Sequence, residues 1–244
     1  MAVSFDLFGT LVTADRPAEP ATAVARALAA RGVSVPDDWE TRYAQVHVDA
    51  PEGAEVALDE HVFAALSSAR SERSRWRSNP GTNADTDTNA NVDTDTDTDT
   101  DTNTDIDRET ARQAVVAAFD PVVETRAGAL AAVDAVRDRG DNVAICSNCS
   151  VPGLVERTLA RSRLEASRFD AVVTSVDYGW RKPAAEIFVE TADRLGVDPA
   201  DLVHVGDDAR TDGGIESVGG TAILLSATPL AELPARLDRE AIDG

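Results

Sequence analysis

The fold class follows most directly from residues 142–159, which read Asn-Val-Ala-Ile-Cys-Ser-Asn-Cys-Ser-Val-Pro-Gly-Leu-Val-Glu-Arg-Thr-Leu. The first six of these residues form an apolar run that ends in polar residues, which is typical of a buried strand. Residues 151–159 then carry apolar side chains at helical spacing. A strand followed by a helix is the repeating unit of a parallel sheet.

The same alternation continues on both sides of this stretch. Further strands are predicted at residues 3–7, 171–174, 202–206 and 221–225, and further helices at residues 128–139 and 183–195. We therefore expect an α/β fold with a Rossmann-like parallel sheet and helices on both faces. In such sheets, ligands bind at the carboxyl ends of the strands.

Residues 14–120 follow a different pattern. Residues 21–30 predict an alanine-rich helix, and an amphipathic helical pattern returns at residues 56–66 and 108–119. These features predict an inserted all-helical cap, which leaves residues 1–13 and 121–244 as the catalytic core. Within the cap, residues 79–107 are rich in Asp and Thr and nearly lack apolar side chains, so we expect a disordered insert. Its Asp repeats lack the glycine and the final Glu of an EF-hand calcium loop.

The chain is strongly acidic, with 44 Asp and Glu residues against 23 Lys and Arg residues and a formal charge of -21. Such a surface repels nucleic acids and anionic lipids, which argues against partners of either kind. Acidic composition with almost no lysine resembles that of halophilic proteins from a salt-rich cytoplasm. No signal peptide and no apolar stretch of about 20 residues is recognisable, so we expect a cytoplasmic protein without membrane contact. The oligomeric state is not predicted.

Reactive side chains follow four of the predicted strands. They are Asp6, the pair Ser147 and Asn148, Lys182, and the group Asp207, Asp208 and Asp212. Lys182 is the only lysine of the chain, which suggests a site that needs a compact ammonium in place of a planar guanidinium. Oxygen ligands of this kind suit Mg²⁺.

Structural interpretations remain for several of these residues. Asp6 alone is also typical of a turn, and Asp212 of a helix cap. His204 lies in an apolar run and is interpreted as a core residue. Cys146 and Cys149 form a single C-x-x-C pair, which is weak evidence for zinc because a structural zinc site needs four ligands.

Four ordered motifs carry a family resemblance. They are Phe5-Asp-Leu-Phe-Gly-Thr-Leu11, Ser147-Asn148, Gly179-Trp-Arg-Lys-Pro183 and Gly206-Asp-Asp-x-x-x-Asp212. In this order and at these strand ends, they resemble the motifs of the haloacid dehalogenase (HAD) superfamily of hydrolases. The helical insertion between the first and second motifs resembles the type-1 cap of that family.

The resemblance implies a role for each matching residue. Asp6 would be the nucleophile and would form a covalent aspartyl intermediate. Ser147 and Lys182 would be further catalytic residues that contact the transferred group. The expected substrate contacts are Asn148, Gly9 and Thr10. The expected Mg²⁺ ligands are the carboxylates of Asp6 and Asp207 and the backbone carbonyl of Phe8. Asp212 would be a further ligand or would orient metal-bound water, and Asp208 could join from the adjacent turn.

The first motif departs from the family pattern at Phe8. Phosphatases of the superfamily usually carry there an Asp that protonates the leaving group, and such general acids typically contribute about 10²- to 10⁴-fold in rate. Either the leaving group needs no proton, as with acyl phosphates, aryl phosphates or halide, or the cap supplies the acid. An aromatic residue here also resembles the dehalogenase branch, whereas the intact Gly206-Asp207 pair favours phosphoryl transfer.

Three functions follow from these observations. The leading one is a Mg²⁺-dependent phosphatase that acts on a small phosphorylated metabolite through an aspartyl-phosphate intermediate. The alternatives are a 2-haloacid dehalogenase-type hydrolase that uses the same Asp, and a non-catalytic descendant that binds a phosphorylated ligand or a protein. Arg42 and Tyr43 are candidates for substrate contacts in the cap.

Overall fold

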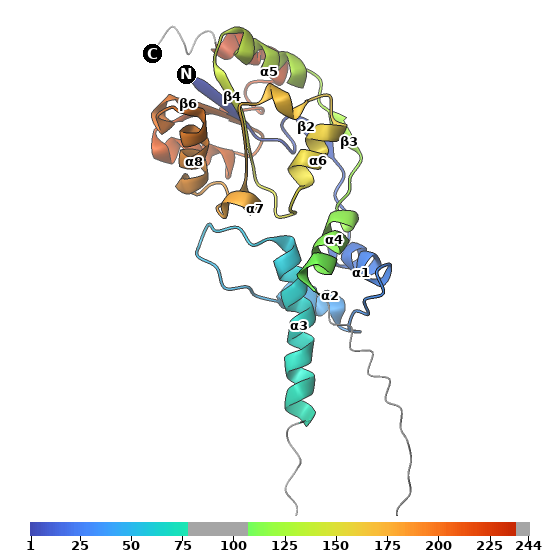
Figure 1. The fold of residues 1–244 in the computed structure, drawn as a ribbon. Coiled ribbons are helices and arrows are strands. Elements are labelled where there is room, and N and C mark those ends of the chain that lie inside the picture. Colours follow the sequence, from blue (N-terminus) through green and yellow to red (C-terminus); the bar gives the residue numbers. More distant parts are fainter. Residues whose placement is uncertain (78–106, 238–244) are drawn as a thin grey trace, which may run out of the picture.

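The structure is a computed structural model that describes residues 1–77 and 107–237, with two parts visible in Figure 1. One part is a sheet flanked by helices, and the other consists of the helices α1 to α4. The expected disordered insert at residues 79–107 lies outside the described residues except for Asp107. The carboxylate of Asp107 accepts a hydrogen bond from the backbone N–H of Thr110 and so caps the first turn of α4.

The central sheet has five parallel strands in the order β5-β4-β1-β6-β7. These strands are β1 (Ala2–Phe5), β4 (Asn142–Ser147), β5 (Ala171–Thr174), β6 (Leu202–Gly206) and β7 (Thr221–Leu224). β1 lies in the middle and pairs with β4 on one side and β6 on the other. Because all five strands run in one direction, their carboxyl ends meet at one edge, and the first, second and fourth sequence motifs follow β1, β4 and β6 there.

Side chains alternate between the two faces of this sheet, as expected for strands buried on both sides. In β4, Val143 and Ile145 belong to one apolar cluster, whereas Ala144 and Cys146 belong to the other. The first cluster is covered by α5 (Ala129–Asp138) and α6 (Leu154–Arg161), and the second by α8 (Ala185–Leu195). The α/β fold with helices on both faces is thereby confirmed.

Four helices make up the second part of the molecule. They are α1 (Pro20–Ala29), α2 (Trp39–Gln45), α3 (Leu58–Arg77) and α4 (Arg108–Ala118). α1 packs against α2 and α4, and α3 packs against α2 and α4. The indole N–H of Trp39 donates to the carbonyl of Ala21 over 2.8 Å, which ties α2 to the start of α1. No helix in residues 1–77 and 107–237 is both long and apolar enough to cross a membrane.

An antiparallel ribbon connects the two parts and was not predicted. It pairs β2 (Val12–Ala14) with β3 (Val123–Thr125), next to the two points where the chain enters and leaves the helices. Each strand has only three residues, so neither shows a periodic pattern in the sequence. The short helix α7 (Ser175–Tyr178) was missed for the same reason. The 3-10 helices are η1 (Ala166–Arg168), η2 (Pro199–Asp201), η3 (Asp212–Val218) and η4 (Leu230–Glu232).

Candidate active site

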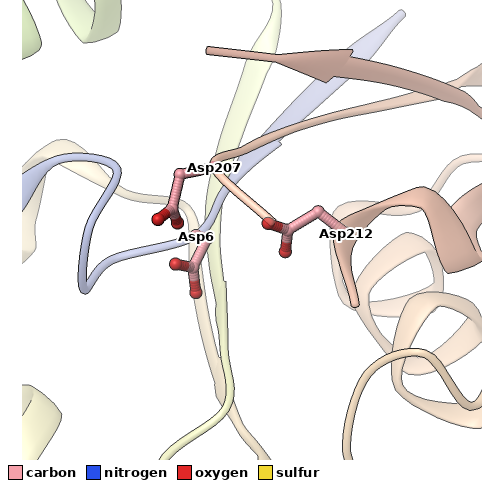
Figure 2. Close-up of side chains that lie close together, drawn as sticks. All are labelled: Asp6, Asp207 and Asp212. Carbon is pink, nitrogen blue, oxygen red and sulfur yellow. The ribbon is translucent and has the colours of Figure 1, made fainter. Parts of the chain in front are cut away.

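Three aspartates converge at the carboxyl edge of the sheet. Asp6 follows β1, Asp207 follows β6, and Asp212 is the first residue of η3. Figure 2 shows their carboxylates turned toward one another, and one oxygen from each lies within 4.8 Å of the others. The two motifs that supply these carboxylates are about 200 residues apart in the chain, and the pairing of β1 with β6 brings them together.

The single lysine of the chain lies against this group of carboxylates. The Nζ of Lys182 donates to Oδ1 of Asp6 over 2.9 Å and to Oδ1 of Asp212 over 2.6 Å. The Lys182 side chain is only 1% exposed. Lys182 thus contacts two of the three carboxylates with one compact charge, and the expectation that the site needs an ammonium stays a prediction.

Burial and the neighbouring charges shift the pKa values of Lys182, Asp212 and Asp207. Burial alone would lower the pKa of the Lys182 ammonium, but the negative charges of Asp6 and Asp212 outweigh it and hold the pKa above its usual range. Burial alone would raise the pKa of Asp212, but the hydrogen bond from His204 and the charge of Lys182 hold it below its usual range. The pKa of Asp207 is raised, first by burial and then by the charge of Asp6.

His204 lies directly beneath the carboxylates and is completely buried. Its Nε2 is 3.1 Å from Oδ1 of Asp212, and its Nδ1 is 2.8 Å from the hydroxyl of Ser4. Burial and the nearby Lys182 charge lower the pKa of its imidazole, so His204 is neutral at pH 7. Since a carboxylate only accepts hydrogen bonds, the proton lies on Nε2. His204 is a core residue, as interpreted from the sequence, and it also orients Asp212.

Asn148 was expected to bind substrate, but in the structure its side-chain amide forms hydrogen bonds with the backbone of Lys182. Its Oδ1 accepts from the Lys182 N–H over 2.7 Å, and its Nδ2 donates to the Lys182 carbonyl over 2.9 Å. Asn148 therefore positions the lysine, and a contact with substrate stays a prediction. The hydroxyl of Ser147 is buried and has no hydrogen-bond partner among the described residues.

Gly9 and Thr10 lie against Asp207. The hydroxyl of Thr10 donates to Oδ1 of Asp207 over 3.1 Å. Gly9 adopts a φ of 91°, and a Cβ there would lie 2.5 Å from Oδ2 of Asp207. Only glycine fits both this backbone conformation and the close approach of the carboxylate. These two residues position Asp207, and their expected contacts with substrate stay predictions.

Gly206 allows an equally close approach on the other side of the cluster. A Cβ on Gly206 would lie 2.1 Å from Cγ of Asp212, which is itself buried and cannot move aside. We expect Gly206→Ala to lower the free energy of unfolding by about 1 to 3 kcal/mol, the usual cost of overpacking a filled core. Gly213→Ala is the matched control, because a Cβ at Gly213 meets nothing within 4 Å. Equal denaturation midpoints for the two variants would contradict this account.

The carboxylates open into a cavity of about 620 Å³ between the sheet edge and the helices. Asp6, Phe8 and Lys182 line its floor, and Tyr43 and Leu58 reach it from α2 and α3. Tyr43 was a candidate for a substrate contact, and the structure places it in this cavity. Arg42, the other candidate, does not line the cavity and is paired with Asp38 over 2.7 Å.

Three other predicted or suspected residues do not belong to the carboxylate group. The Asp208 carboxylate accepts hydrogen bonds from the backbone and guanidinium of Arg210 and is not part of the three-carboxylate group. Cys146 and Cys149 are both free and pack in different apolar clusters. Burial raises the pKa of each thiol to about 11, so both are protonated at neutral pH.

Residues 46–57, the contact loop between α2 and α3, reach from the helices to the sheet edge, a feature that sequence reasoning missed. Ala54 forms an antiparallel bridge with Trp180, and the N–H of Arg181 donates to the Gly53 carbonyl over 3.0 Å. The buried carboxylate of Glu55 accepts from the hydroxyls of Ser150 (2.8 Å) and Ser175 (2.6 Å). The loop therefore holds the segment that carries Lys182.

We expect Glu55→Ala to lower the free energy of unfolding by about 2 kcal/mol, because it removes two hydrogen bonds to a buried charged group. Glu52→Ala, in an exposed position on the same loop, is the control and should be close to neutral. Chemical denaturation of the two variants measures the difference. Overlapping denaturation curves would show that the Glu55 carboxylate does not fasten the loop.

The donor set of the cluster fits a hard divalent cation. Asp6, Asp207 and Asp212 supply carboxylate oxygens, which Mg²⁺ prefers as ligands. Lys182 balances one of their three negative charges, and the remaining excess of negative charge contributes to the raised pKa of Asp207. The expected fourth ligand, the carbonyl of Phe8, belongs to a residue that lines the same cavity and stays a prediction.

Comparison with known proteins gives a consistent result. A model of the haloacid dehalogenase-like hydrolases matches residues 1–217. The chain is similar to the N-acylneuraminate-9-phosphatase of Rattus norvegicus, with 36% identity over 104 residues, which cover 34% of this chain and 42% of the relative. For the Mus musculus N-acylneuraminate-9-phosphatase the values are 43% identity over 61 residues, 23% of this chain and 25% of the relative. The matched stretches thus span less than half the length of these curated relatives.

Solved structures share the fold. A HAD phosphatase from Thermococcus onnurineus aligns with a TM-score of 0.51 and 21% identity, over 91% of this chain and 85% of that chain. CbbY from Rhodobacter sphaeroides, solved in complex with phosphate, aligns with a TM-score of 0.53 and 16% identity, over 91% of this chain and 84% of that chain. At these identities the likeness concerns the fold alone.

Proposed function

The chain belongs to the haloacid dehalogenase-like hydrolases, and from this premise we propose that it is a Mg²⁺-dependent phosphatase of small phosphorylated metabolites. The observation that carries the proposal is the convergence of Asp6, Asp207 and Asp212 at the floor of a cavity, where the ammonium of Lys182 contacts Asp6 and Asp212. The names of the curated relatives, both phosphatases, support it.

The geometry supports Asp6 as the nucleophile. Lys182 holds Oδ1 of Asp6, which leaves Oδ2 to attack phosphorus. The bond between phosphorus and the leaving oxygen breaks, and its electron pair goes with the leaving group. Lys182 stabilises the negative charge of the phosphoryl oxygens next to the nucleophile. Water then attacks phosphorus, which releases phosphate and regenerates the Asp6 carboxylate.

The remaining residues prepare the site for this reaction. Thr10 and Gly9 hold Asp207, His204 orients Asp212, and the backbone contacts of Asn148 fix the position of Lys182. Asp6, Asp207, Asp212 and the Phe8 carbonyl would hold Mg²⁺, which supplies positive charge beside the transferred phosphoryl group. The unpartnered hydroxyl of Ser147 is proposed to donate to that group.

The proposal is tested by phosphate release from a panel of phosphate esters and acetyl phosphate, at high salt, with Mg²⁺ or with EDTA. We expect release with Mg²⁺, loss of release with EDTA, and recovery when Mg²⁺ is restored. Halide release from a 2-haloacid in the presence of EDTA would favour the dehalogenase alternative. Binding of phosphate without turnover of any compound would favour the non-catalytic alternative.

A further inference from the structure

The cavity above Asp6 is lined by three arginines, Arg16, Arg181 and Arg210. All three are exposed, whereas the ammonium of Lys182 is buried among the carboxylates of the floor. The chain as a whole carries a formal charge of -21, so three exposed cations around one cavity differ from the general character of its surface. Positive charge at the entrance of a site attracts anions and orients them there.

The positive charge of Arg210 is already balanced within the protein. Its Nη2 lies 3.1 Å from Oδ2 of Asp208, and Oδ1 of the same carboxylate accepts the backbone N–H of Arg210 over 2.9 Å. Asp208 also lines the cavity, so these two side chains form a local ion pair at its edge. We therefore assign no role in substrate binding to Arg210.

The guanidinium of Arg181 donates no hydrogen bond within the described part of the chain. It faces the carboxylate of Glu55, but its Nη1 lies 3.8 Å from Oε1, which is too long for a hydrogen bond. Glu55 instead accepts its hydrogen bonds from the hydroxyls of Ser150 and Ser175. The backbone N–H of Arg181 donates to the carbonyl of Gly53. The backbone of Arg181 is thus held at the cavity, while the N–H donors of its side chain stay available.

Arg16, which follows β2, lies near the same loop of the cavity. Within residues 1–77 and 107–237 its side chain forms no hydrogen bond or ion pair, not even with the neighbouring Asp15, which also lines the cavity. Burial raises the pKa of the Cys149 thiol, the charge of Glu55 raises it further, and the charge of Arg16 acts to lower it. Arg16 and the carboxylate that Arg181 faces are therefore both close to Cys149, in the loop after β4.

From these observations we propose that Arg16 and Arg181 bind a second anionic group of the substrate, a carboxylate or a phosphate at the end away from the transferred phosphoryl group. The inference rests on the proposed phosphatase function and specifies its substrate class. A guanidinium offers its N–H donors in a planar fork that matches the paired oxygens of either group. Lys182 contacts the transferred phosphoryl group at the floor, and its neighbour Arg181 contacts the second anion.

The test compares kcat/KM within two matched pairs of phosphate esters, with Mg²⁺ and at one fixed salt concentration. The first pair is glycerol phosphate and the phosphoglycerate in which a carboxylate replaces the terminal hydroxymethyl group. The second pair is fructose monophosphate and fructose bisphosphate. We expect the more anionic member of at least one pair to exceed the other by about 10-fold or more, the usual effect of a hydrogen bond to a charged group.

The outcome of these comparisons identifies the second anion. A preference for phosphoglycerate supports a carboxylate, and a preference for the bisphosphate supports a phosphate. Equal kcat/KM values within both pairs would overturn the inference and leave the phosphatase function standing. No release from any of the four esters would instead overturn the phosphatase function on which the inference rests.

The variants Arg16→Gln and Arg181→Gln connect the preference to these two side chains. Each is expected to lower the ratio of kcat/KM between the anionic and the neutral ester by about 5-fold or more. This ratio cancels a general disturbance, such as a displaced Lys182, because such a disturbance affects both esters alike. Arg26→Gln is the control, since it removes the same charge from an exposed position of α1 and should leave the ratio unchanged.

Two results would show that the second anion is not held by these arginines. A native ratio in both Arg16→Gln and Arg181→Gln would mean that another part of the cavity binds it. An equal fall of the ratio in Arg26→Gln would mean that the preference reflects long-range attraction to the whole protein, with no contact at the cavity.

Discussion

Replacing Asp6 with asparagine is expected to reduce turnover by about 10⁴-fold or more, as loss of a nucleophile does in other hydrolases. An amide oxygen is a poor nucleophile, so no covalent bond to phosphorus forms. The substitution keeps the shape of the side chain and its contact with Lys182, which lies 2.9 Å from Oδ1 of Asp6. The protein should therefore stay folded while its chemistry stops.

The control for Asp6→Asn is Asp193→Asn, the same chemical change at an exposed position of α8. We expect this variant to keep its activity. Rapid acid quenching and intact mass spectrometry should detect a phosphoryl group on the native protein during turnover and none on Asp6→Asn. Turnover within about 10-fold of native in a folded Asp6→Asn protein would assign the nucleophile to another group.

The sheet was predictable because its strands are long enough to leave a pattern. Residues 142–147, 171–174 and 202–206 were predicted as strands, and the structure shows β4, β5 and β6 with these same bounds. These strands are buried on both faces, so their sequence is a continuous apolar run bounded by polar residues. The prediction for α6 was less accurate. The helix begins at Leu154 and not at the predicted Val151, because Pro152 and Gly153 form a turn before it.

The reactive residues were predictable because parallel strands end at one edge. Asp6, Lys182 and the pair Asp207 and Asp212 come from three separate parts of the sequence. Each follows a strand or the segment after it, and the structure brings all four residues together. What could not be predicted was which polar groups support them. Asn148 turns to the backbone of Lys182 and His204 to Asp212, and such contacts depend on side-chain direction, which the spacing of motifs does not specify.

The position of the contact loop could not be predicted from the sequence for a related reason. Residues 46–57 have no regular apolar period, and the position of Glu55 becomes meaningful only when Ser150 and Ser175 are seen beside it. These two serines lie about 100 residues further along the chain, on either side of β5. A buried carboxylate that joins a helical insertion to the sheet edge is a long-range contact, and a single sequence carries no signal for it.

The three carboxylates also explain why the site needs its lysine. Without a counter-charge, Asp6 and Asp212 would be two buried negative charges in close proximity, and breaking a buried ion pair typically costs about 3 to 5 kcal/mol. The Nζ of Lys182 forms an ion pair with both carboxylates. Asn148 and the contact loop fix the backbone of the segment that carries Lys182. The stability of the site and its chemistry therefore depend on the same side chain.

Replacing Lys182 with arginine is expected to reduce kcat by about 10²- to 10³-fold, although the formal charge is unchanged. The Lys182 nitrogen reaches Asp6 at 2.9 Å and Asp212 at 2.6 Å from a side chain that is 1% exposed. A planar guanidinium spreads its charge over a wider fork and cannot place one nitrogen between these two oxygens. The larger group also overpacks the buried site, at a cost of about 1 to 3 kcal/mol in unfolding free energy.

The comparison that isolates this effect is Arg26→Lys, the reverse exchange at an exposed position of α1, which should alter neither stability nor turnover. Steady-state kinetics over a range of substrate concentrations separates a fall in kcat from a rise in KM, and thermal denaturation reports overpacking. A folded Lys182→Arg protein with lowered kcat shows that the site needs a compact charge. Native kcat in that variant would mean that positive charge alone is enough, and that retention of the chain's one lysine has no chemical reason.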